Sequence, residues 1–591
     1  GKLSSMDDPE LSNISFDELS NIFYEQALGL VEGGVDVLLI ETSQDILEVK
    51  AAIIGFKRVF EETGIYLPIQ AQVTLDTTGR MLLGTDMAAA LSILEGMSIH
   101  VMGLNCSTGP DHMREPIIYL GENSALPVSC IPNAGLPLNI DGEAVYPLEP
   151  IPFADTMTEF VEKHNVNIVG GCCGTTPEHL KLLVERVRNI EVRERKENKQ
   201  PRLASAIQVM SMHQEPAPFL IGERLNTQGS RKFKRLMLEG DFESVLPIAM
   251  QQINSGAHGL DISTALTERP DEAELMRRVI KHISPIIFVP LVIDTTELDV
   301  METALQTAPG RCLINSTNLE AGRVKADKVF ALAKKYNAAV IALTIDETGM
   351  AKSSERKLEV ARKIYDIAIN EHGLKPYDLV FDPLTFTLAT GDPEYDNSAK
   401  ETFEGIRKIK SELPGVLTSL GISNVSFGLS PLTRPAINSV MLYHAVQAGL
   451  DMAIVNPAQI TPYTDISSYE REIIEDLIFN RKPDALQHLI NHFDDMGTSV
   501  KAKEESQKET LEKMTPEERL QWRIIHRDKQ DIERDINEIL DSEGDGSKHA
   551  IAIRILNEVL LPAMKEVGDR FGSGELILPF VLQSAEVMKK S

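Results

Sequence analysis

The chain has 591 residues, of which 42% are hydrophobic and 25% charged, and this ordinary globular composition excludes a disordered or fibrous protein. Its 59 Lys and Arg residues against 88 Asp and Glu residues give a net charge of −29, which argues against nucleic-acid and membrane-surface partners, because both need a basic face. No apolar run approaches the roughly 20 residues of a membrane-spanning helix. Five cysteines in so long a chain predict reduced thiols in a cytoplasmic protein.

The first 195 residues alternate short Val- and Ile-rich runs with amphipathic stretches, which is typical of βα units around a parallel sheet. Five strands cannot close a (β/α)8 barrel, so we interpret residues 1–195 as the C-terminal part of a TIM-type barrel that lacks its first strands. The predicted strands are Val35–Glu41, Pro68–Leu75, Ile99–Cys106, Pro127–Ala134 and Val166–Cys173.

A charged, weakly apolar stretch follows, and we predict a linker at 196–214. Eight further βα units then fill 215–490, which is the size and rhythm of a complete (β/α)8 barrel. Their predicted strands are Phe219–Leu225, Gly259–Ser263, Ile286–Asp294, Cys312–Thr317, Ala338–Asp346, Leu379–Pro383, Thr418–Gly428 and Asp451–Asn456.

The composition changes again after the second block. Residues 491–515 are rich in Lys, Glu, Gln and Ser and predict a second linker, and residues 516–591 have a purely helical pattern that suits a small all-α four-helix bundle. The predicted fold class is therefore α/β, with two TIM-type barrels, the first incomplete, followed by this bundle. We expect any domain movement to hinge at the two linkers.

Three cysteines form the first candidate site. Cys106 ends one predicted strand, and Cys172 and Cys173 end the last predicted strand of the same block, between glycines. Strand ends meet on one face of a barrel, so three thiolates there could hold a zinc ion with its fourth position open. Ordinary buried cysteines and a vicinal disulfide are the alternatives, and we expect Cys130 and Cys312 to be structural.

Polar side chains end several predicted strands of the second block, where they could hydrogen-bond a ligand. The alternative to ligand binding is a structural role, in which these side chains cap the N-termini of the helices that follow. The residues at these positions include Asp294, Asn315, Asp346, Asp382 and Asn424.

Three sets of motifs make the chain recognisable. The stretches 103–106 (GLNC) and 170–177 (GGCCGTTP) resemble the zinc motifs of homocysteine S-methyltransferases, and 221–226 (IGERLN) with 421–428 (GISNVSFG) resembles the pterin-binding barrel of methyltetrahydrofolate:corrinoid methyltransferases. The stretches 567–572 (VGDRFG) and 576–579 (LILP) resemble a helical cobalamin cap. In this order, the three sets resemble the cobalamin-dependent methionine synthase family.

The resemblance implies a methyltransferase that moves a methyl group from 5-methyltetrahydrofolate via cobalamin to zinc-bound homocysteine, giving methionine and tetrahydrofolate. It implies two cofactors, Zn²⁺ and cobalamin (methylcobalamin), and two sites. The zinc ligands would be Cys106, Cys172 and Cys173, with Glu41 contacting homocysteine. Pterin contacts would come from Glu223, Asn226, Asp294, Asn315, Asp346, Asp382 and Asn424, with Asn424 and Asp382 acting in catalysis at N5.

By the same resemblance, Phe571, Leu578 and Val581 would cover the corrin, although bundle core is the alternative from periodicity. We find no Asp-x-His-x-x-Gly motif, so we expect a cobalamin-binding domain or corrinoid protein to be missing from this chain, together with the first strands of the first barrel. The cap residues would then stand exposed. In the second barrel, 260–264 (LDIST) departs from the family pattern.

Two other functions remain open at this point. One is a methyltetrahydrofolate:corrinoid methyltransferase that serves a separate corrinoid protein, and the other is a non-catalytic corrinoid-docking scaffold whose first block holds no metal.

Overall fold

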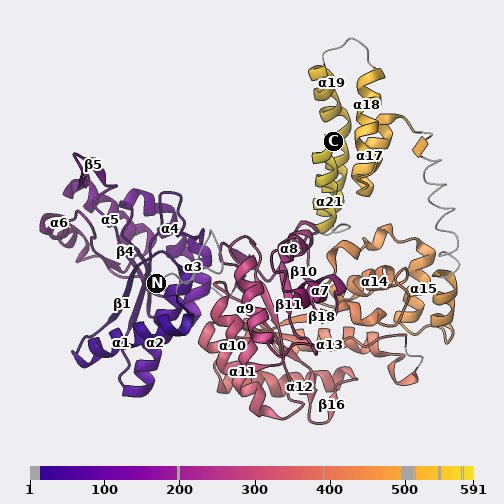
Figure 1. Cartoon of the computed structure of the whole chain (residues 1–591), viewed down its shortest axis with the longest axis horizontal. Helices are drawn as coiled ribbons and strands as arrows, with labels where there is room; N and C mark the ends of the chain where they lie inside the picture. The colour runs from indigo at the N-terminus through magenta and orange to yellow at the C-terminus, as the bar shows by residue number, and fades with distance from the viewer. Residues whose placement is uncertain are drawn as a thin grey trace.

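The computed structural model describes residues 14–195, 200–389, 392–493, 511–512, 514–542, 548–573, 576 and 578–591. The chain forms three successive parts, an α/β unit at the left of Figure 1, a barrel at the centre and a group of long helices that rises beside it. Among these residues, no helix is both long and apolar enough to cross a membrane.

The first part is built on an open parallel sheet of five strands in the order β1-β2-β3-β4-β7. All five predicted strands are present, most of them shorter than expected, and the sheet does not close on itself. The strands are β1 (Leu38–Ser43), β2 (Ile69–Val73), β3 (Val101–Asn105), β4 (Val128–Ile131) and β7 (Ile168–Val169), and an exposed hairpin of β5 (Leu138–Ile140) and β6 (Glu143–Val145) follows β4.

Amphipathic helices cover this sheet. The helix α2 shows why they form: Asp45 caps its N-terminus by accepting from Leu47 N, Val49 and Ile53 are fully buried along its inner face, and Gly64 ends it with a φ of +70°. The helices of this part are α1 (Phe16–Glu32), α2 (Ile46–Thr63), α3 (Met87–Leu94), α4 (Pro110–Asn123), α5 (Pro150–His164) and α6 (Pro177–Val187).

The predicted linker at 196–214 differs from the structure over its described residues. Residues 200–214 contain the antiparallel hairpin β8 (Arg202–Ala204) and β9 (Val209–Ser211). Leu203 and Met212 are fully buried in the same apolar cluster as the barrel interior. Burial of these two side chains ties the segment to the barrel, so it is a structured connection rather than an exposed linker.

The second part is a closed barrel of eight parallel strands, as the sequence predicts. Its interior is filled by apolar side chains from alternate strand positions, such as Phe219, Val292 and Val380. One predicted strand, Thr418–Gly428, is too long, because Ile422–Ser426 is a 3₁₀ helix, η5. The strands are β10 (Phe219–Asn226), β11 (Gly259–Ser263), β12 (Leu291–Asp294), β13 (Leu313–Thr317), β14 (Ala339–Leu343), β17 (Leu379–Asp382), β18 (Leu417–Gly421) and β19 (Met452–Val455).

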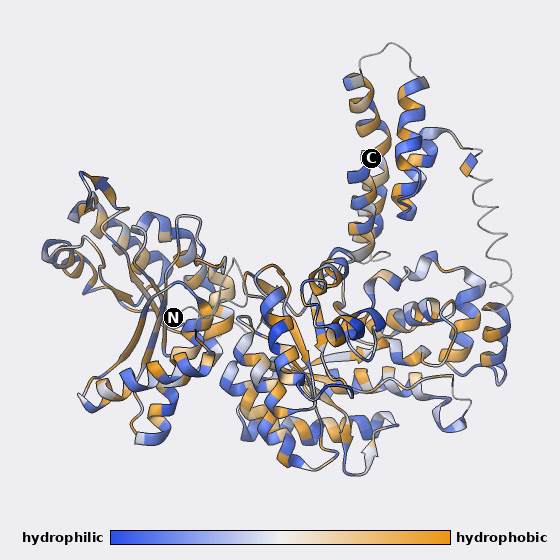
Figure 2. Cartoon of the chain, in the orientation of Figure 1, coloured by the Kyte–Doolittle hydropathy of each residue, from blue (hydrophilic) through white to orange (hydrophobic). Residues whose placement is uncertain are grey.

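Helices surround the barrel, and the colours of Figure 2 show hydrophobic and hydrophilic residues alternating along them, as expected of amphipathic helices. A small hairpin of β15 (Ile345–Asp346) and β16 (Gly349–Met350) follows β14. The helices are α7 (Arg231–Glu239), α8 (Val245–Asn254), α9 (Glu272–Ile283), α10 (Leu298–Thr307), α11 (Arg323–Tyr336), α12 (Ser354–Tyr365), α13 (Ser398–Glu412), α14 (Arg434–Gln447) and α15 (Ser468–Ile478).

The first part and the barrel share a packed, hydrogen-bonded boundary. The buried ammonium of Lys50 donates to the carbonyl oxygens of Leu305 (3.2 Å) and Ala308 (2.7 Å) at the end of α10. The side chain of Asn337 donates to the carbonyls of Ser92 and Ile93. Buried donors paired across a boundary hold the two parts in one arrangement.

The C-terminal region is helical, as predicted, and α17 contacts α18, α20 and α21 around a small apolar core. Most of the second predicted linker, 491–515, lies outside the described residues. The helices are α17 (Pro516–His526), α18 (Ile532–Ser542), α19 (Lys548–Ile555), α20 (Leu561–Gly572) and α21 (Leu578–Lys590), with a π-helical turn at Leu556–Leu560.

Candidate functional site

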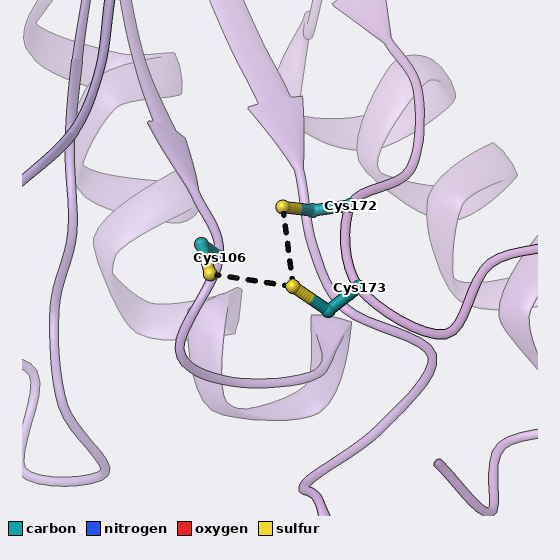
Figure 3. A group of neighbouring side chains, drawn as sticks. All are labelled: Cys106, Cys172 and Cys173. Carbon is teal, nitrogen blue, oxygen red and sulfur yellow. Dashed lines mark hydrogen bonds between the residues drawn. The ribbon is translucent and has the colours of Figure 1, made fainter. Parts of the chain in front are cut away.

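The three singled-out cysteines meet at the edge of the open sheet. Cys106 directly follows β3, and Cys172 and Cys173 lie in the loop after β7. The Sγ atom of Cys173 is 3.9 Å from the Sγ atoms of both Cys106 and Cys172 (Figure 3), and all three atoms lie within 4.8 Å of one another. All five cysteines of the chain are free thiols, and Cys130 and Cys312 are buried away from this site, as expected.

This spacing fits a tetrahedral metal ion. Zinc–sulfur bonds of about 2.3 Å at tetrahedral angles place two sulfurs about 3.8 Å apart, close to the two 3.9 Å distances. In the described part of the chain, no other group of three His, Cys, Asp or Glu residues has such geometry. Three protein ligands leave the fourth position open, which is the arrangement of catalytic zinc.

The end of β4 places these cysteines through the backbone. The N–H of Cys106 donates to Ile131 O (3.1 Å), and the N–H of Cys172 donates to Pro132 O (2.8 Å). The N–H of Cys173 donates to Asn133 Oδ1 (3.1 Å). Cys106 has a φ of +61°, a left-handed conformation that is unusual outside glycine and that turns its side chain at a strand end. The thiols are therefore held by their backbone before any ion arrives.

The three thiols can ionise together only near a cation. Burial, and then the neighbouring sulfur of Cys106, raise the pKa of Cys172 to about 12. Adjacent thiolates repel each other, so they lose their protons together only when a positive charge lies between them. The donor set therefore suits a soft divalent cation such as Zn²⁺.

Tyr146 is part of this site, and no sequence spacing singled it out. It follows the exposed hairpin β5–β6, and burial and then the neighbouring sulfur of Cys173 raise the pKa of its phenol. Its ring lies on Gly174, where an added Cβ would meet the ring at 2.2 Å. Gly174 also has a φ of +77°, so two requirements explain a glycine directly after the cysteine pair.

Glu41 lies on β1 and is connected to the cysteine loop through Asn105. The fully buried side chain of Asn105 accepts from Thr42 N (2.8 Å) and donates to Thr42 Oγ1 (2.9 Å) and Glu41 Oε2 (3.3 Å). Asn105 directly precedes Cys106, so one residue links the zinc-type ligands to the exposed carboxylate predicted to contact homocysteine.

A second group of polar side chains meets at the carboxyl ends of four adjacent barrel strands. Asn226 on β10 donates to Asp294 Oδ2 on β12 (2.8 Å) and more weakly to Asp261 Oδ2 on β11 (3.5 Å). Asn315 on β13 donates to Asp261 Oδ1 (3.0 Å). Three of these residues were predicted, and the structure brings them together. Asp261 was missed, and its signal was a carboxylate inside an otherwise apolar run, in the stretch that departs from the family pattern.

The two carboxyl groups of this polar cluster share one protonation equilibrium. Burial raises the pKa of Asp294 to about 6. Burial, and then the charge of Asp294, raise the pKa of Asp261 well above its usual range. Two carboxylates this close do not both ionise readily, so the pair offers one carboxylate that accepts and one carboxyl that donates.

Glu223 and Asn424 lie on the next side of the barrel mouth. Ser423 Oγ in η5 donates to Glu223 Oε1 on β10 (2.8 Å), and burial raises the pKa of Glu223. Asn424 follows Ser423 and is exposed, as is the ring of Phe427 beyond it, which is 70% exposed. The structure thus places Asn424 at the open surface of the barrel rather than among the buried carboxylates.

Asp382 ends β17, is half-buried and has a raised pKa. Its Oδ1 accepts from Leu384 N (2.7 Å), and burial raises its pKa to about 6 against the opposing effects of that N–H and of Lys357.

Asp346 is the predicted pterin residue that the structure does not bring to the polar cluster. Its carboxylate accepts from Thr348 (2.8 Å), Arg356 (2.5 Å) and Lys363 (3.1 Å). Burial alone would raise the pKa of Asp346, but these donors hold it well below the usual range. Its oxygens already serve an ion-pair network of β15 and α12.

The cap residues are less exposed than expected. Phe571 and Val581 are half-buried against an apolar cluster that contains Phe580 of α21 and Ile466 and Ile474 of the barrel part. Arg527 adds an ion pair of 2.5 Å to Asp465. The side chain of Leu578 lies outside the described residues. In this structure, apolar surface of the C-terminal helices is covered by the barrel part.

Comparison with known families divides the chain in the same order. The model of homocysteine S-methyltransferase matches residues 1–187, that of pterin binding enzymes matches 222–456, and that of a B12 binding domain matches 516–591. The last match corrects one expectation: a domain of the B12 binding type is present in this chain, and it falls on the segment predicted to be the cap.

Two relatives match nearly the whole chain. The methionine synthase of Mycobacterium tuberculosis (strain ATCC 25618 / H37Rv) is 38% identical over 587 residues, and that of Mycobacterium leprae (strain TN) is 37% identical over 592 residues. Each alignment covers 98% of this chain and 48% of the relative. The chain therefore spans about half the length of these curated relatives.

Among solved structures, a dihydropteroate synthase of Xanthomonas albilineans is 18% identical, with a TM-score of 0.33, over 44% of this chain and 94% of that one. The homocysteine methyltransferase MmuM of Escherichia coli is 20% identical, with a TM-score of 0.24, over 30% of this chain and 58% of that one.

Proposed function

Because the chain belongs to the cobalamin-dependent methionine synthase family, we propose that it moves a methyl group from 5-methyltetrahydrofolate via cobalamin to homocysteine, giving methionine and tetrahydrofolate. The observation that carries the proposal is the presence of two chemically different sites on one chain. A group of three thiols with the spacing of a zinc site lies in the first part, and a polar cluster around the buried Asp261 lies at the mouth of the barrel.

The proposed division of labour follows the three parts. Residues 1–195 would bind homocysteine as the C-terminal portion of a barrel, 215–490 would bind the folate, and 516–591 would cover cobalamin with Phe571, Leu578 and Val581 as a four-helix cap. The segments 196–214 and 491–515 would join them. A cytoplasmic location is part of the same proposal.

In the first site, Cys106, Cys172 and Cys173 would hold Zn²⁺. Bound zinc would lower the pKa of the homocysteine thiol, so that a thiolate is available near neutral pH. The backbone bonds from β4 fix the three ligands, and Glu41, oriented by Asn105, would contact the polar end of homocysteine.

In the second site, the polar cluster would bind the edge of the pterin ring, which carries both N–H donors and acceptors. An ionised Asp294 and Asp382 would accept from ring N–H groups, while the protonated partner of the Asp261–Asp294 pair would donate. Asn226 and Asn315 would hold the carboxyl groups of Asp294 and Asp261 in place. The hydrogen-bonding partners of the pterin edge are therefore oriented before the ring binds.

Release of the methyl group requires a proton at N5, because an unprotonated amine is a poor leaving group. Asn424, at the open surface, would lie near N5, and ionised Asp382 would accept a hydrogen bond within the network that delivers this proton. General acid catalysis of this kind contributes roughly 10²–10⁴-fold. Bound cobalamin would supply the nucleophile that accepts the methyl group.

A second function has one observation in its favour. The five-stranded sheet of the first part is open, which favours a methyltetrahydrofolate:corrinoid methyltransferase whose barrel works with a separate corrinoid protein. A non-catalytic docking scaffold is a weaker alternative, because it gives no reason for the pre-positioned thiols and carboxyl groups.

The test uses the full 591-residue chain. Methyl transfer from 5-methyltetrahydrofolate to added free cob(I)alamin is followed by absorbance, and zinc content and methylation of homocysteine are measured in parallel. Both transfers support the main proposal. Transfer from folate alone, with zinc far below one per chain, supports the second function. The absence of both transfers in a folded chain contradicts both enzymatic proposals.

A further inference from the structure

The turn that follows β17 is strained and firmly held. Leu384, two residues after Asp382, has a φ of +68°, a left-handed conformation that is strained for a residue with a Cβ. Three contacts fix this turn: Leu384 N donates to Asp382 Oδ1 (2.7 Å), Thr402 Oγ1 donates to Leu384 O (2.8 Å), and Lys357 Nζ donates to Pro383 O. Strain that surrounding contacts enforce is concentrated at functional positions.

Lys357 is the unusual partner of this turn, because its ammonium group is buried. It lies on α12, is fully buried, and also donates to Ala351 O (2.9 Å). Its ammonium is 5.1 Å from the ring centroid of Phe386, which belongs to the same turn. Burial lowers the pKa of Lys357 to about 8, and the charges of Asp382 and Glu401 oppose that shift. A buried ammonium is costly, so a chain retains one only where its contacts repay the desolvation.

The neighbouring helix leaves room for this side chain. A Cβ added at Gly405 of α13 would lie 2.7 Å from Cδ of Lys357. Glycine within a helix is less favourable than alanine, so its presence opposite the lysine stem has a packing reason.

We propose that Lys357 is a positioning residue for Asp382, and that its ammonium holds the Asp382–Leu384 turn in the geometry that binds the pterin. The inference rests on the proposed function, because it assumes that Asp382 contacts the folate. Lys357 lies behind the turn and would not touch the substrate itself.

The groups that face Asp382 make the role testable through pH. They are Lys357 from α12 and the backbone N–H groups of Leu384 and Gly421, all of which oppose the rise in pKa caused by burial. Removing the ammonium therefore raises the pKa of Asp382 further, and ionised Asp382 becomes available only at higher pH.

The chain offers a matched control in Lys50. It is also a buried lysine whose ammonium donates to two backbone carbonyls, and burial likewise lowers its pKa to about 8. Its partners are Leu305 and Ala308 at the end of α10, on the side of the barrel where strands begin. A substitution there costs stability in the same way without touching the turn after β17.

The experiment measures binding of 5-methyltetrahydrofolate to the full chain by calorimetric titration between pH 5 and 8, with unfolding midpoints recorded for every variant. We expect Lys357→Met to weaken binding at least about tenfold and to move its acid limb to higher pH. We expect Lys357→Arg to recover part of the loss, and Lys50→Met to bind within about twofold of the wild type even if its midpoint falls.

The possible results separate the role of Lys357 from the proposed function. If the wild type binds the folate and Lys357→Met binds it with the same affinity, the inference is overturned while the proposed function stands. Equal losses of affinity in Lys357→Met and Lys50→Met also overturn the inference. A wild-type chain that does not bind the folate contradicts the proposed function and this inference with it. If Lys357→Met does not fold, Gly405→Ala replaces it: the added methyl displaces the lysine stem, so weaker binding supports the inference and unchanged binding refutes it.

Discussion

The two candidate sites are both built at the ends of parallel strands, but they balance charge in opposite ways. The thiols of the first part lie partly exposed on loops beyond an open sheet, and they can ionise together only if a cation is added between them. The carboxyl groups of the barrel, Asp261 buried and Asp294 half-buried, lie within a closed ring of strands, and they retain protons instead. If the proposed function holds, parallel-strand ends provide one frame for two chemistries, metal binding and recognition of a pterin ring.

The largest expected effect removes a ligand from the thiol group. With Cys172→Ser, two sulfurs and a weak hydroxyl ligand remain, so we expect zinc content to fall far below one per chain and homocysteine methylation to fall by at least about 10²-fold. Transfer from the folate should be unchanged, because the second site shares no residue with the first. Elemental analysis and the two transfer assays measure these quantities.

Cys130→Ala is the control for Cys172→Ser. Cys130 is fully buried in β4 and its Sγ lies 3.9 Å from Sδ of Met113, so truncation leaves a small cavity that costs about 1 kcal/mol. Zinc content should stay at the wild-type level. Loss of zinc in both variants would show that the thiol group is sensitive to any disturbance of the sheet, and the comparison between the sites would fail.

The next largest effect concerns Asp294, one of the two paired carboxyl groups in the barrel. Asp294→Asn keeps the shape of the side chain but removes the acceptor charge, and we expect 5-methyltetrahydrofolate to bind about 10–10²-fold more weakly. Asp346→Asn is the control, because Asp346 is bonded to Arg356, Lys363 and Thr348 outside the cluster. It should lower the free energy of unfolding by about 1–3 kcal/mol and leave folate affinity unchanged. Equal losses of affinity would place Asp346 in the site after all.

Asp294→Asn should also change stability with a definite sign. The folded pKa of about 6 lies above the unfolded value of 3.8, so the wild type loses stability as pH rises from about 4 to about 6, by up to about 3 kcal/mol. The asparagine variant escapes this loss. Denaturant midpoints should therefore favour the variant at pH 8 and converge with the wild type near pH 4, whereas a variant that is less stable at pH 8 would show that the Asp294 charge is well compensated.

A smaller effect is the pH dependence of folate binding itself. If ionised Asp294 and Asp382 accept from the pterin, binding should weaken by up to about tenfold per carboxylate for each pH unit below about 6. In Asp382→Asn, the acid limb should become shallower because one titrating acceptor is gone. Titrations between pH 5 and 8 test this, and a flat wild-type profile would argue that neither carboxylate accepts from the ligand.

Much of this arrangement was accessible from the sequence, for identifiable reasons. The carboxyl ends of parallel strands share one face, so the sequence predicts that side chains at these ends lie close together. This holds for Cys106, Cys172 and Cys173, and also for Asn226, Asp294 and Asn315. Asp346 lies apart from the polar cluster, because a short hairpin after β14 turns it toward the cations of α12, and sequence spacing does not report such a local ion-pair network.

The missed residues lacked a periodic signal. Asp261 stands inside a buried strand, where the pattern predicts apolar packing, and its role depends on contacts from β10 and β13. Tyr146 comes from a loop 27 residues before Cys173 and meets it only through the fold. Leu203 and Met212 were assigned to a linker because their segment follows a highly charged run, although both pack into the barrel.

The smallest predicted effect returns to Tyr146. With Tyr146→Phe, the ring still lies on Gly174, but the sulfur of Cys173 loses the neighbouring phenol group, so we expect zinc affinity to change by about tenfold or less and folate binding not to change. Gly174→Ala is the contrasting variant, because its methyl group would overlap the ring and strain a residue with a φ of +77°. Competition with a chelator measures both affinities. If the phenol tunes the sulfur, Tyr146→Phe alters affinity while the unfolding midpoint stays constant, and Gly174→Ala lowers both. Identical behaviour of the two variants would mean that Tyr146 acts only by packing, and the thiol site would then depend on its backbone alone.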